Sequence, residues 1–239
     1  MKTKKSNIYA WLFLLLSVAL AAPVQAANDK DVQQTRKTSP FHGISVSSGI
    51  DLYLTQGNSE AVVVKADPDI IDDLVTEVDN GILKIYMKKH FNWTWNRTRK
   101  VEVTFVDLTK LDVSAGADVK AQNAFRLDDI DISVSSGADL KIEDLTAKSV
   151  SLDVSSGADA RLSGQVDQFK GSSSSGANLH CGDLVAESCV VSASSGADAD
   201  VHVTKDLKAR ASSGGDVRYK GNPSQKDIDE SSGGDVNRF

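Results

Sequence analysis

Apolar and polar residues alternate through most of the chain beyond residue 40, and a short glycine motif interrupts the alternation at regular intervals. The motif reads SAGADV at 114–119, and its near-copies continue to SSGGDV at 231–236. A period of two predicts β-strands, because successive side chains of a strand point to opposite faces. The chain is therefore predicted to be an all-β protein whose strands are separated by one recurring turn.

The glycines of this motif measure the length of the repeat. Their spacings are 21, 20, 19, 20, 18 and 19 residues along the series Gly116, Gly137, Gly157, Gly176, Gly196, Gly214 and Gly233. A repeat of this length indicates a stacked array, since one unit cannot bury its own apolar face. Apolar residues recur at fixed distances from each glycine and would form inward columns, with rungs ~4.8 Å apart. These columns predict a parallel β-helix, a solenoid of about 20 residues per coil.

Each motif glycine has a structural task in this interpretation. A chain that turns a corner often needs a positive φ, which glycine adopts without a Cβ clash. The neighbouring serine and alanine side chains are small, so that successive corners can stack closely. We therefore interpret the seven glycines as structural corners rather than as parts of a catalytic loop.

The part of the chain before the regular repeats is irregular. A related motif, SSGIDL at 47–52, stands 67 residues before the first regular glycine, a spacing that we interpret as about three coils with insertions. Between them, Pro68 occupies a helix-start position and Gly81 follows Asn80, so a short helix or an irregular cap is expected there. Such a cap would cover the exposed first rung.

The first 26 residues are predicted to be a secretory signal peptide. Lysines at positions 2, 4 and 5 precede an apolar stretch at 8–20, and small residues at 24 and 26 make a cleavage site. The apolar stretch has 13 residues, fewer than the ~20 that span a bilayer, so we expect no transmembrane segment in the mature form. The protein is expected to be exported to the periplasm, the outer membrane, the cell surface or the medium.

The predicted domain organisation follows from these patterns. Removal of residues 1–26 would leave a flexible N-terminus at 27–39 and a single β-helix domain at 40–239. Within that domain, irregular N-terminal coils occupy 40–110 and regular coils occupy 111–239.

The charge of the chain limits its partners. The formal charge is −6, and loss of the three leader lysines changes it to −9. An acidic protein of this kind is poorly suited to bind nucleic acid or an anionic membrane surface. We therefore expect neither as a partner.

Two outward columns of charge follow the corner glycines. The first lies two residues after each glycine and is acidic at nearly every coil: Asp118, Asp139, Asp159, Asn178, Asp198, Asp216 and Asp235. The second lies two residues further and is mainly basic: Lys120, Lys141, Arg161, His180, Asp200, Arg218 and Asn237. Carboxylates ~4.8 Å apart repel each other, so we expect the basic column to compensate as a salt-bridged solvent face. Weak calcium binding is the alternative, although the nine-residue pattern of calcium-binding solenoids is absent.

An aromatic segment at 88–100, KKHFNWTWNRTRK, stands apart from the repeats. Phe91, Trp93 and Trp95 fall on alternate positions of this segment. A row of aromatic rings on one side could stack on sugar rings or on a partner surface. The other interpretation is a hairpin whose aromatic rings cover the first rungs. The three residues are candidate ligand contacts.

The two cysteines, Cys181 and Cys189, fall on inward columns of one coil. Export would permit oxidation, and two cysteines permit one disulfide. A disulfide needs Cα atoms within about 7 Å, which positions on successive faces do not guarantee. The sequence does not distinguish between a disulfide and a pair of buried thiols.

Catalytic chemistry is not indicated by the sequence. Enzymes built on β-helices gather a few acidic or basic residues in one groove, whereas here the charged residues recur by column. The histidines are scattered, at His42, His90, His180 and His202. No metal-ligand spacing, nucleophile elbow or phosphate loop is present, so we predict no enzyme, cofactor or metal site.

The order of these parts resembles one known family. The segment from FHGISVSSGIDLYLTQG through VEVTFVDLTKLDVSAGADV to the SSGAD series, residues 40–236, resembles the head GIN domain family of exported bacterial β-solenoids, described as auto-transporter adhesins. The resemblance implies a right-handed β-helix and a location in the envelope or at the surface. It implies no catalytic residues.

We therefore expect an exported, non-catalytic adhesin or ligand-binding protein of the bacterial cell envelope, whose partner is a glycan or an envelope or surface protein. A structural element that stacks through its C-terminal end, as a homo-oligomer, is one alternative. In that end, Val236 and Phe239 would either plug the last coil or leave it open to another copy. A carbohydrate-active enzyme is the other alternative.

Overall fold

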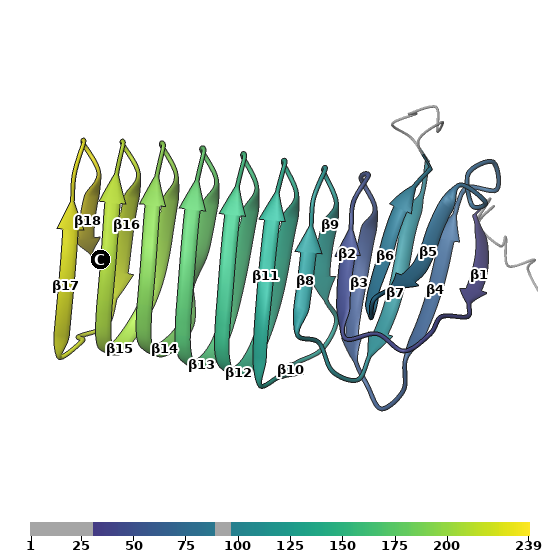
Figure 1. The fold of residues 1–239 in the computed structure, drawn as a ribbon, viewed down its shortest axis with the longest axis horizontal. Helices are drawn as coiled ribbons and strands as arrows, with labels where there is room; N and C mark the ends of the chain where they lie inside the picture. The colour runs from purple at the N-terminus through teal and green to yellow at the C-terminus, as the bar shows by residue number, and fades with distance from the viewer. Residues whose placement is uncertain (1–30, 89–96) are drawn as a thin grey trace, which may run out of the picture.

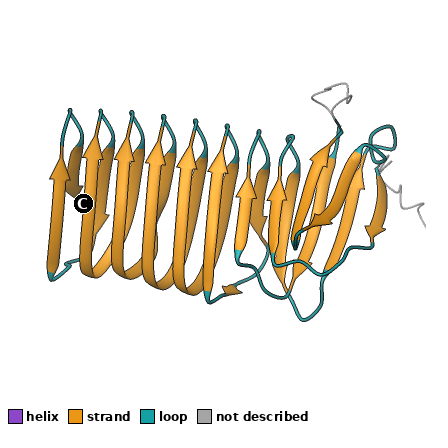
Figure 2. Cartoon of the chain, in the orientation of Figure 1, coloured by secondary structure: helices purple, strands orange, loops and turns teal. Residues whose placement is uncertain are grey.

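The computed structural model describes residues 31–88 and 97–239, and this part of the chain folds into strands and turns without a helix (Figure 2). The predicted signal peptide lies outside the described residues. The strands are β1 (Val32–Arg36), β2 (Gly43–Val46), β3 (Asp51–Gln56), β4 (Ala61–Ala66), β5 (Leu74–Asp79), β6 (Ile82–Met87), β7 (Arg99–Phe105), β8 (Lys110–Val113), β9 (Asp118–Ala121), β10 (Phe125–Arg126), β11 (Asp129–Ser135), β12 (Asp139–Ser155), β13 (Asp159–Ser174), β14 (Asn178–Ser194), β15 (Asp198–Ser212), β16 (Asp216–Lys220), β17 (Gln225–Glu230) and β18 (Asp235–Arg238).

The strands stack side by side along one axis and form a β-solenoid (Figure 1). We call face A the stack of strands that follow the glycine corners: β3, β9, the first parts of β12 to β15, β16 and β18. Face B is the stack of strands that precede the corners: β2, β8, β11, the last parts of β12 to β15, and β17. Neighbouring strands in both stacks are parallel, as in β12 and β13, which pair from Asp139↔Asp159 to Ser155↔Ser174. The predicted all-β solenoid with coils of about 20 residues is confirmed.

Each corner is a tight turn in which two consecutive residues have positive φ. At the corner before β12, φ is 57° at Ser136 and 66° at Gly137. Two central residues with positive φ define a type I′ turn. The amide of Gly137 donates a hydrogen bond to the carbonyl of Ser156 in the next coil, at 3.1 Å, so the corners are joined to one another as well as to their strands. The positive φ of the glycine was predicted from the sequence, and that of the serine before it was not.

The interior of the coils is filled by the inward columns. Leu140, Ala160 and Leu179 are buried in register on face A, and Val150 and Phe169 are buried on face B. In parallel sheets that stack in this way, side chains of equal position lie directly above one another. The result is a single apolar core that runs the length of the described solenoid.

The spacing of 67 residues between Gly49 and Gly116 does not correspond to three coils, and that interpretation is wrong. Strand β3 pairs directly with β9, with Asp51 opposite Asp118, and the Gly49 amide donates to the Ala115 carbonyl at 3.0 Å. The first corner is therefore the immediate neighbour of the second. The residues between them leave the stack, build its N-terminal end, and return.

Both parallel and antiparallel pairs build this N-terminal end: β7 and β6 pair parallel with β3 and β2, and β4, β1 and β5 are then added antiparallel. Face A is extended by β7, β4 and β1, and face B by β6 and β5. The helix considered around Pro68 is absent: this stretch is a turn that buries Ile70 and Ile71 over the first coils. Asn80 and Gly81 have φ values of 51° and 76° and form the type I′ turn of the β5–β6 hairpin. The irregular cap is therefore an all-β one.

Strand β1 lies within the segment 27–39, for which the sequence predicts flexibility. Its residues Val32–Arg36 pair antiparallel with β4 from Val32↔Ala66 to Arg36↔Val62. The Arg36 guanidinium also donates to the Ile71 carbonyl at 2.9 Å. This part of the segment is an edge strand of the cap.

The C-terminal end of the stack carries charge on its inward positions. In β17, Lys226 stands in register with the buried Leu207, and Glu230 with the buried Ala211. The Glu230 carboxylate accepts a hydrogen bond from the Val236 amide at 2.7 Å and so bridges the two strands of the last coil. Phe239 does not plug the coil: it is 57% exposed and lies beside the Lys220 ammonium.

Candidate ligand-binding groove

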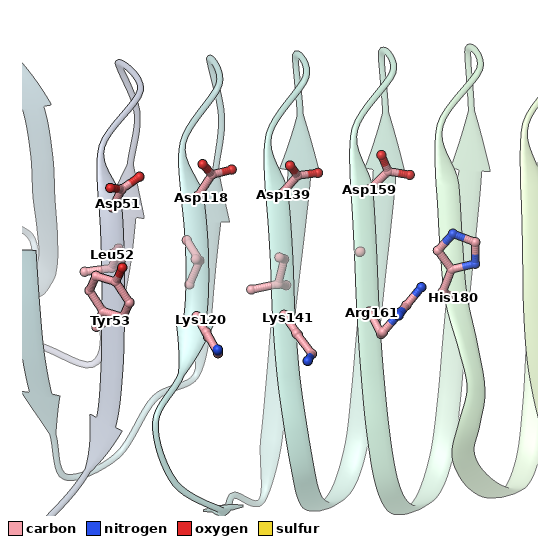
Figure 3. Close-up of a pocket in the computed structure, with 13 residues that line it drawn as sticks. Asp51, Leu52, Tyr53, Asp118, Lys120, Asp139, Lys141, Asp159, Arg161 and His180 are labelled. Carbon is pink, nitrogen blue, oxygen red and sulfur yellow. The ribbon is translucent and has the colours of Figure 1, made fainter. Parts of the chain in front are cut away.

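The acidic column of the sequence is a straight row of carboxylates on face A. Asp51, Asp118, Asp139 and Asp159 stand in register on β3, β9, β12 and β13, and Figure 3 shows them at one level below the corners. We call these four residues the carboxylate row. Asp51 was not assigned to this column from the sequence, although it lies two residues after Gly49 and so carries the same signal.

A second row lies two residues further along the same strands. Lys120, Lys141 and Arg161 stand in register on β9, β12 and β13, and we call them the basic row. Tyr53 continues this row on β3, and His180 continues it on β14 (Figure 3). Residues two apart on a strand point to the same side, so both rows face outward from face A.

The two rows line one groove on the surface of face A. Its volume is about 700 Å³, and it extends across β3, β9, β12, β13 and β14 (Figure 3). The carboxylate row, the basic row, Tyr53 and His180 all line it. We call this feature the charged groove. It is elongated across the strands, which is the direction of the solenoid axis.

The surroundings of Asp118 disfavour its ionised form. The pKa of Asp118 is raised, first by burial and then by the negative charges of Asp139 and Asp51. Two interactions stabilise carboxylates at the ends of the row. The Asn178 amide donates a hydrogen bond to Asp159 at 2.6 Å, and Asp51 interacts electrostatically with the buried Arg99 guanidinium.

The expected salt-bridged face is only partly present. Among the described residues, no ion pair joins the carboxylate row to the basic row. Lys141 instead pairs with Glu143 at 2.7 Å, on the side away from the carboxylates. Ion pairs between coils occur at the β14 end of the groove and beyond it, where Asp200 accepts from Arg218 at 2.8 Å and lies 3.3 Å from His180 Nδ1. The two rows of the groove therefore lie side by side without an ion pair between them, and Glu143 lies near all three members of the basic row.

The other predicted residues lie elsewhere. Phe91, Trp93 and Trp95 fall outside the described residues. Cys181 and Cys189 are free, buried thiols inside one coil. Burial raises the pKa of both thiols, that of Cys189 to about 12, so neither forms a reactive thiolate near neutral pH.

No described group of three or more His, Cys, Asp or Glu residues is arranged to hold a metal ion. The carboxylate row extends along a line, whereas calcium sites wrap six to eight oxygen atoms around one point. Within residues 31–88 and 97–239, no helix is long and apolar enough to cross a membrane.

The fold and the groove together define a β-solenoid protein with a charged surface along one face. The chain belongs to the family described as putative auto-transporter adhesin, head GIN domain, which matches residues 40–223. The resemblance seen in the sequence is thereby confirmed.

Solved structures share this fold. A putative adhesin from Bacteroides fragilis is 20% identical, with a TM-score of 0.82 over 88% of this chain and 97% of that one. A putative lipid binding protein from Parabacteroides distasonis is also 20% identical, with a TM-score of 0.71 over 89% of this chain and 98% of that one. A putative adhesin from Parabacteroides merdae is 16% identical, with a TM-score of 0.66 over 89% and 97% of the two chains. No curated protein matches the chain.

Proposed function

We propose that the protein is an exported, non-catalytic binding protein of the bacterial cell envelope that acts as an adhesin, and that the charged groove is its contact surface. The observation that carries the proposal is the groove itself: two rows of opposite charge, held in register from β3 to β13 and facing solvent. A rigid stack of strands holds charged groups at fixed intervals, which suits recognition of an extended partner. Family membership and the adhesin descriptions of the structural neighbours agree with this role.

The arrangement of the charges supports binding rather than catalysis. Active sites bring an acid, a base and a stabilising group together around one reacting atom. In the groove, Asp118, Asp139 and Asp159 repeat the same position from coil to coil, as do the residues of the basic row. Turnover of a polysaccharide by the purified protein would overturn the non-catalytic assignment.

The aromatic residues Phe91, Trp93 and Trp95 stay a separate prediction. In the chain they precede β7, and β7 pairs with β3, which carries Asp51 and Tyr53 at one end of the groove. We propose them as further contacts for a glycan or protein partner. A Trp93→Ala, Trp95→Ala variant tests their contribution independently of the groove.

The test is binding of the purified protein to an array of bacterial glycans and to isolated envelope fractions. A double variant, Asp139→Asn with Lys141→Gln, removes one member of each row while the buried neighbours of both residues stay in place. Binding that is lost in this variant supports the proposal. Binding that is lost only in the tryptophan variant moves the contact surface to the aromatic segment. Absence of binding to any glycan or envelope component overturns the adhesin assignment.

A further inference from the structure

We propose that the ligand of the charged groove is a zwitterionic polysaccharide, a polymer that carries ammonium groups along one edge and carboxylate or phosphate groups along the other. This inference rests on the proposed function and names the chemistry of its ligand. The ammonium groups would lie against the carboxylate row, and the anionic groups against Lys120, Lys141 and Arg161.

Charge complementarity excludes a polymer of one sign. A polycation would gain from the carboxylate row and be repelled by the basic row, and a polyanion would meet the reverse. The two rows are only two residues apart on each strand, so a ligand that fills the groove meets both. A ligand with both charges gains from both rows and can enter without leaving one of them unmatched.

The geometry of the rows favours a polymer that lies along the solenoid axis. Equivalent charges recur at every coil, a spacing of ~4.8 Å. An extended polypeptide in the same position presents side chains on one side every ~6.7 Å. This spacing differs from that of the coils, so its charges would not stay opposite those of the rows beyond a few coils. A small zwitterion would contact one coil, whereas a polymer contacts successive coils and gains from their effective concentration.

The electrostatics of the carboxylate row favour a cationic ligand. The carboxylates are held side by side in register, and the pKa of Asp118 is raised by burial and by the charges of Asp139 and Asp51. An ammonium group placed between two such carboxylates would relieve their repulsion. Ionisable groups held in an unfavourable environment are typical of functional sites.

A lipid headgroup that carries an ammonium and a phosphate would satisfy the same chemistry at one coil. The observations favour the polymer, because the inward positions beneath the groove are filled by Leu52, Val119 and Leu140, which are buried. Acyl chains would stay outside the protein. Binding to a lipid surface is one outcome of the test below.

The test compares three oligosaccharides of matched length by calorimetry. De-N-acetylated hyaluronan carries one ammonium and one carboxylate per disaccharide, native hyaluronan only the carboxylate, and chitosan only ammonium groups. Vesicles of phosphatidylethanolamine are the fourth probe. Each is titrated into the wild-type protein and into Asp139→Asn, Lys141→Gln. The control variant is Asp128→Asn, Lys148→Gln, which removes an exposed ion pair of 2.8 Å that lies outside the groove.

We expect the zwitterionic oligosaccharide to bind at least about tenfold more tightly than either single-charge polymer, since each of these lacks one of the two sets of charged interactions. The affinity is expected to fall as salt is raised. The groove variant is expected to lose about tenfold or more, and the control variant to bind like wild type. Circular dichroism and thermal unfolding show that both variants are folded.

Three binding results would overturn the inference, and so would a complete absence of binding. They are equal or tighter binding of hyaluronan or chitosan, preferential binding of the vesicles, and unchanged affinity in the groove variant. Absence of binding by all four probes also overturns it. If glycans on the array still bind through the groove in that case, the adhesin assignment survives. If nothing binds there, both proposals fail.

Discussion

Asp118 and Asp139 occupy the same position on neighbouring coils of face A, and the pKa of Asp118 is raised first by burial and then by the charge of Asp139. The solenoid fold imposes this relationship, because residues one repeat apart must stack at the spacing of adjacent strands. A repeat that places a carboxylate at the same position in each coil therefore builds repulsion into the surface.

Replacement of Asp118 by asparagine is expected to stabilise the fold at neutral pH. A carboxyl whose pKa is raised on folding destabilises the native state above that pKa, and this contribution disappears once the pH falls below the unfolded value of about 4. The free energy of unfolding of Asp118→Asn should therefore exceed that of wild type at about pH 7, and the two should converge at about pH 3. Urea denaturation at a series of pH values measures both.

The control for this prediction is Asp128→Asn, because Asp128 is ion-paired with Lys148 at 2.8 Å and has no place in the row. That variant should gain no stability at neutral pH. An Asp118→Asn protein that is less stable than wild type at neutral pH would show that the carboxylate is compensated in the native state.

The corner glycines are expected to be required for their backbone conformation and not for lack of space. Gly157 has a φ of 67°, and a Cβ added there would meet nothing within 4 Å. Gly157→Ala should therefore lower the free energy of unfolding by about 1–2 kcal/mol, the strain of a left-handed conformation. Gly157→Asn should cost less, although asparagine is larger, because asparagine tolerates that conformation. Equal or greater loss in the asparagine variant, measured by urea denaturation, would show that space decides.

The charged inward positions of β17 are expected to keep the protein from stacking end to end. Inward-pointing charges on an edge strand are one way in which proteins prevent edge-to-edge association. The double variant Lys226→Leu, Glu230→Leu continues the apolar columns of Leu207 and Ala211 to the end of the solenoid. Light scattering after size-exclusion chromatography should show concentration-dependent oligomers for this variant and a monomer for wild type.

The matched control is Asp227→Leu, which adds an apolar residue to the same strand at an outward position, in register with Lys208. It should remain monomeric. Oligomers of the wild-type protein that disappear when β17 is disrupted would favour the assembly role for this chain.

The two thiols are expected to be inert in the folded protein. Cys181 and Cys189 are buried, and burial raises the pKa of each, so the thiolate that reacts with alkylating agents is rare. Iodoacetamide at about pH 8 should label neither residue in native protein and both after denaturation. A mass two hydrogens lower, together with no labelling after denaturation without reductant, would reveal a disulfide.

Much of the regular solenoid could be predicted because its signals are local. The period of two, the recurring SSGAD motif and its spacing of about 20 residues are all properties of short segments, and stacking follows from them. The same holds for the two rows of charge, since residues two and four after each glycine point outward wherever the coil is regular. The N-terminal end lacks such a repeat. There, Asn80–Gly81 could be the end of a helix or a type I′ hairpin, and only the strands on either side decide between them.

The sequence by itself therefore determined the architecture of the coils, the identity of the corners and the existence of outward rows of charge. The tertiary structure decided which residues of distant segments stand side by side in each row. It alone placed Asp51 and Tyr53 beside Asp118 and Lys120, across an excursion of 67 residues. The physical reason is that strand pairing between distant segments depends on the whole fold that brings them together, whereas alternation and turn formation depend on a few neighbouring residues.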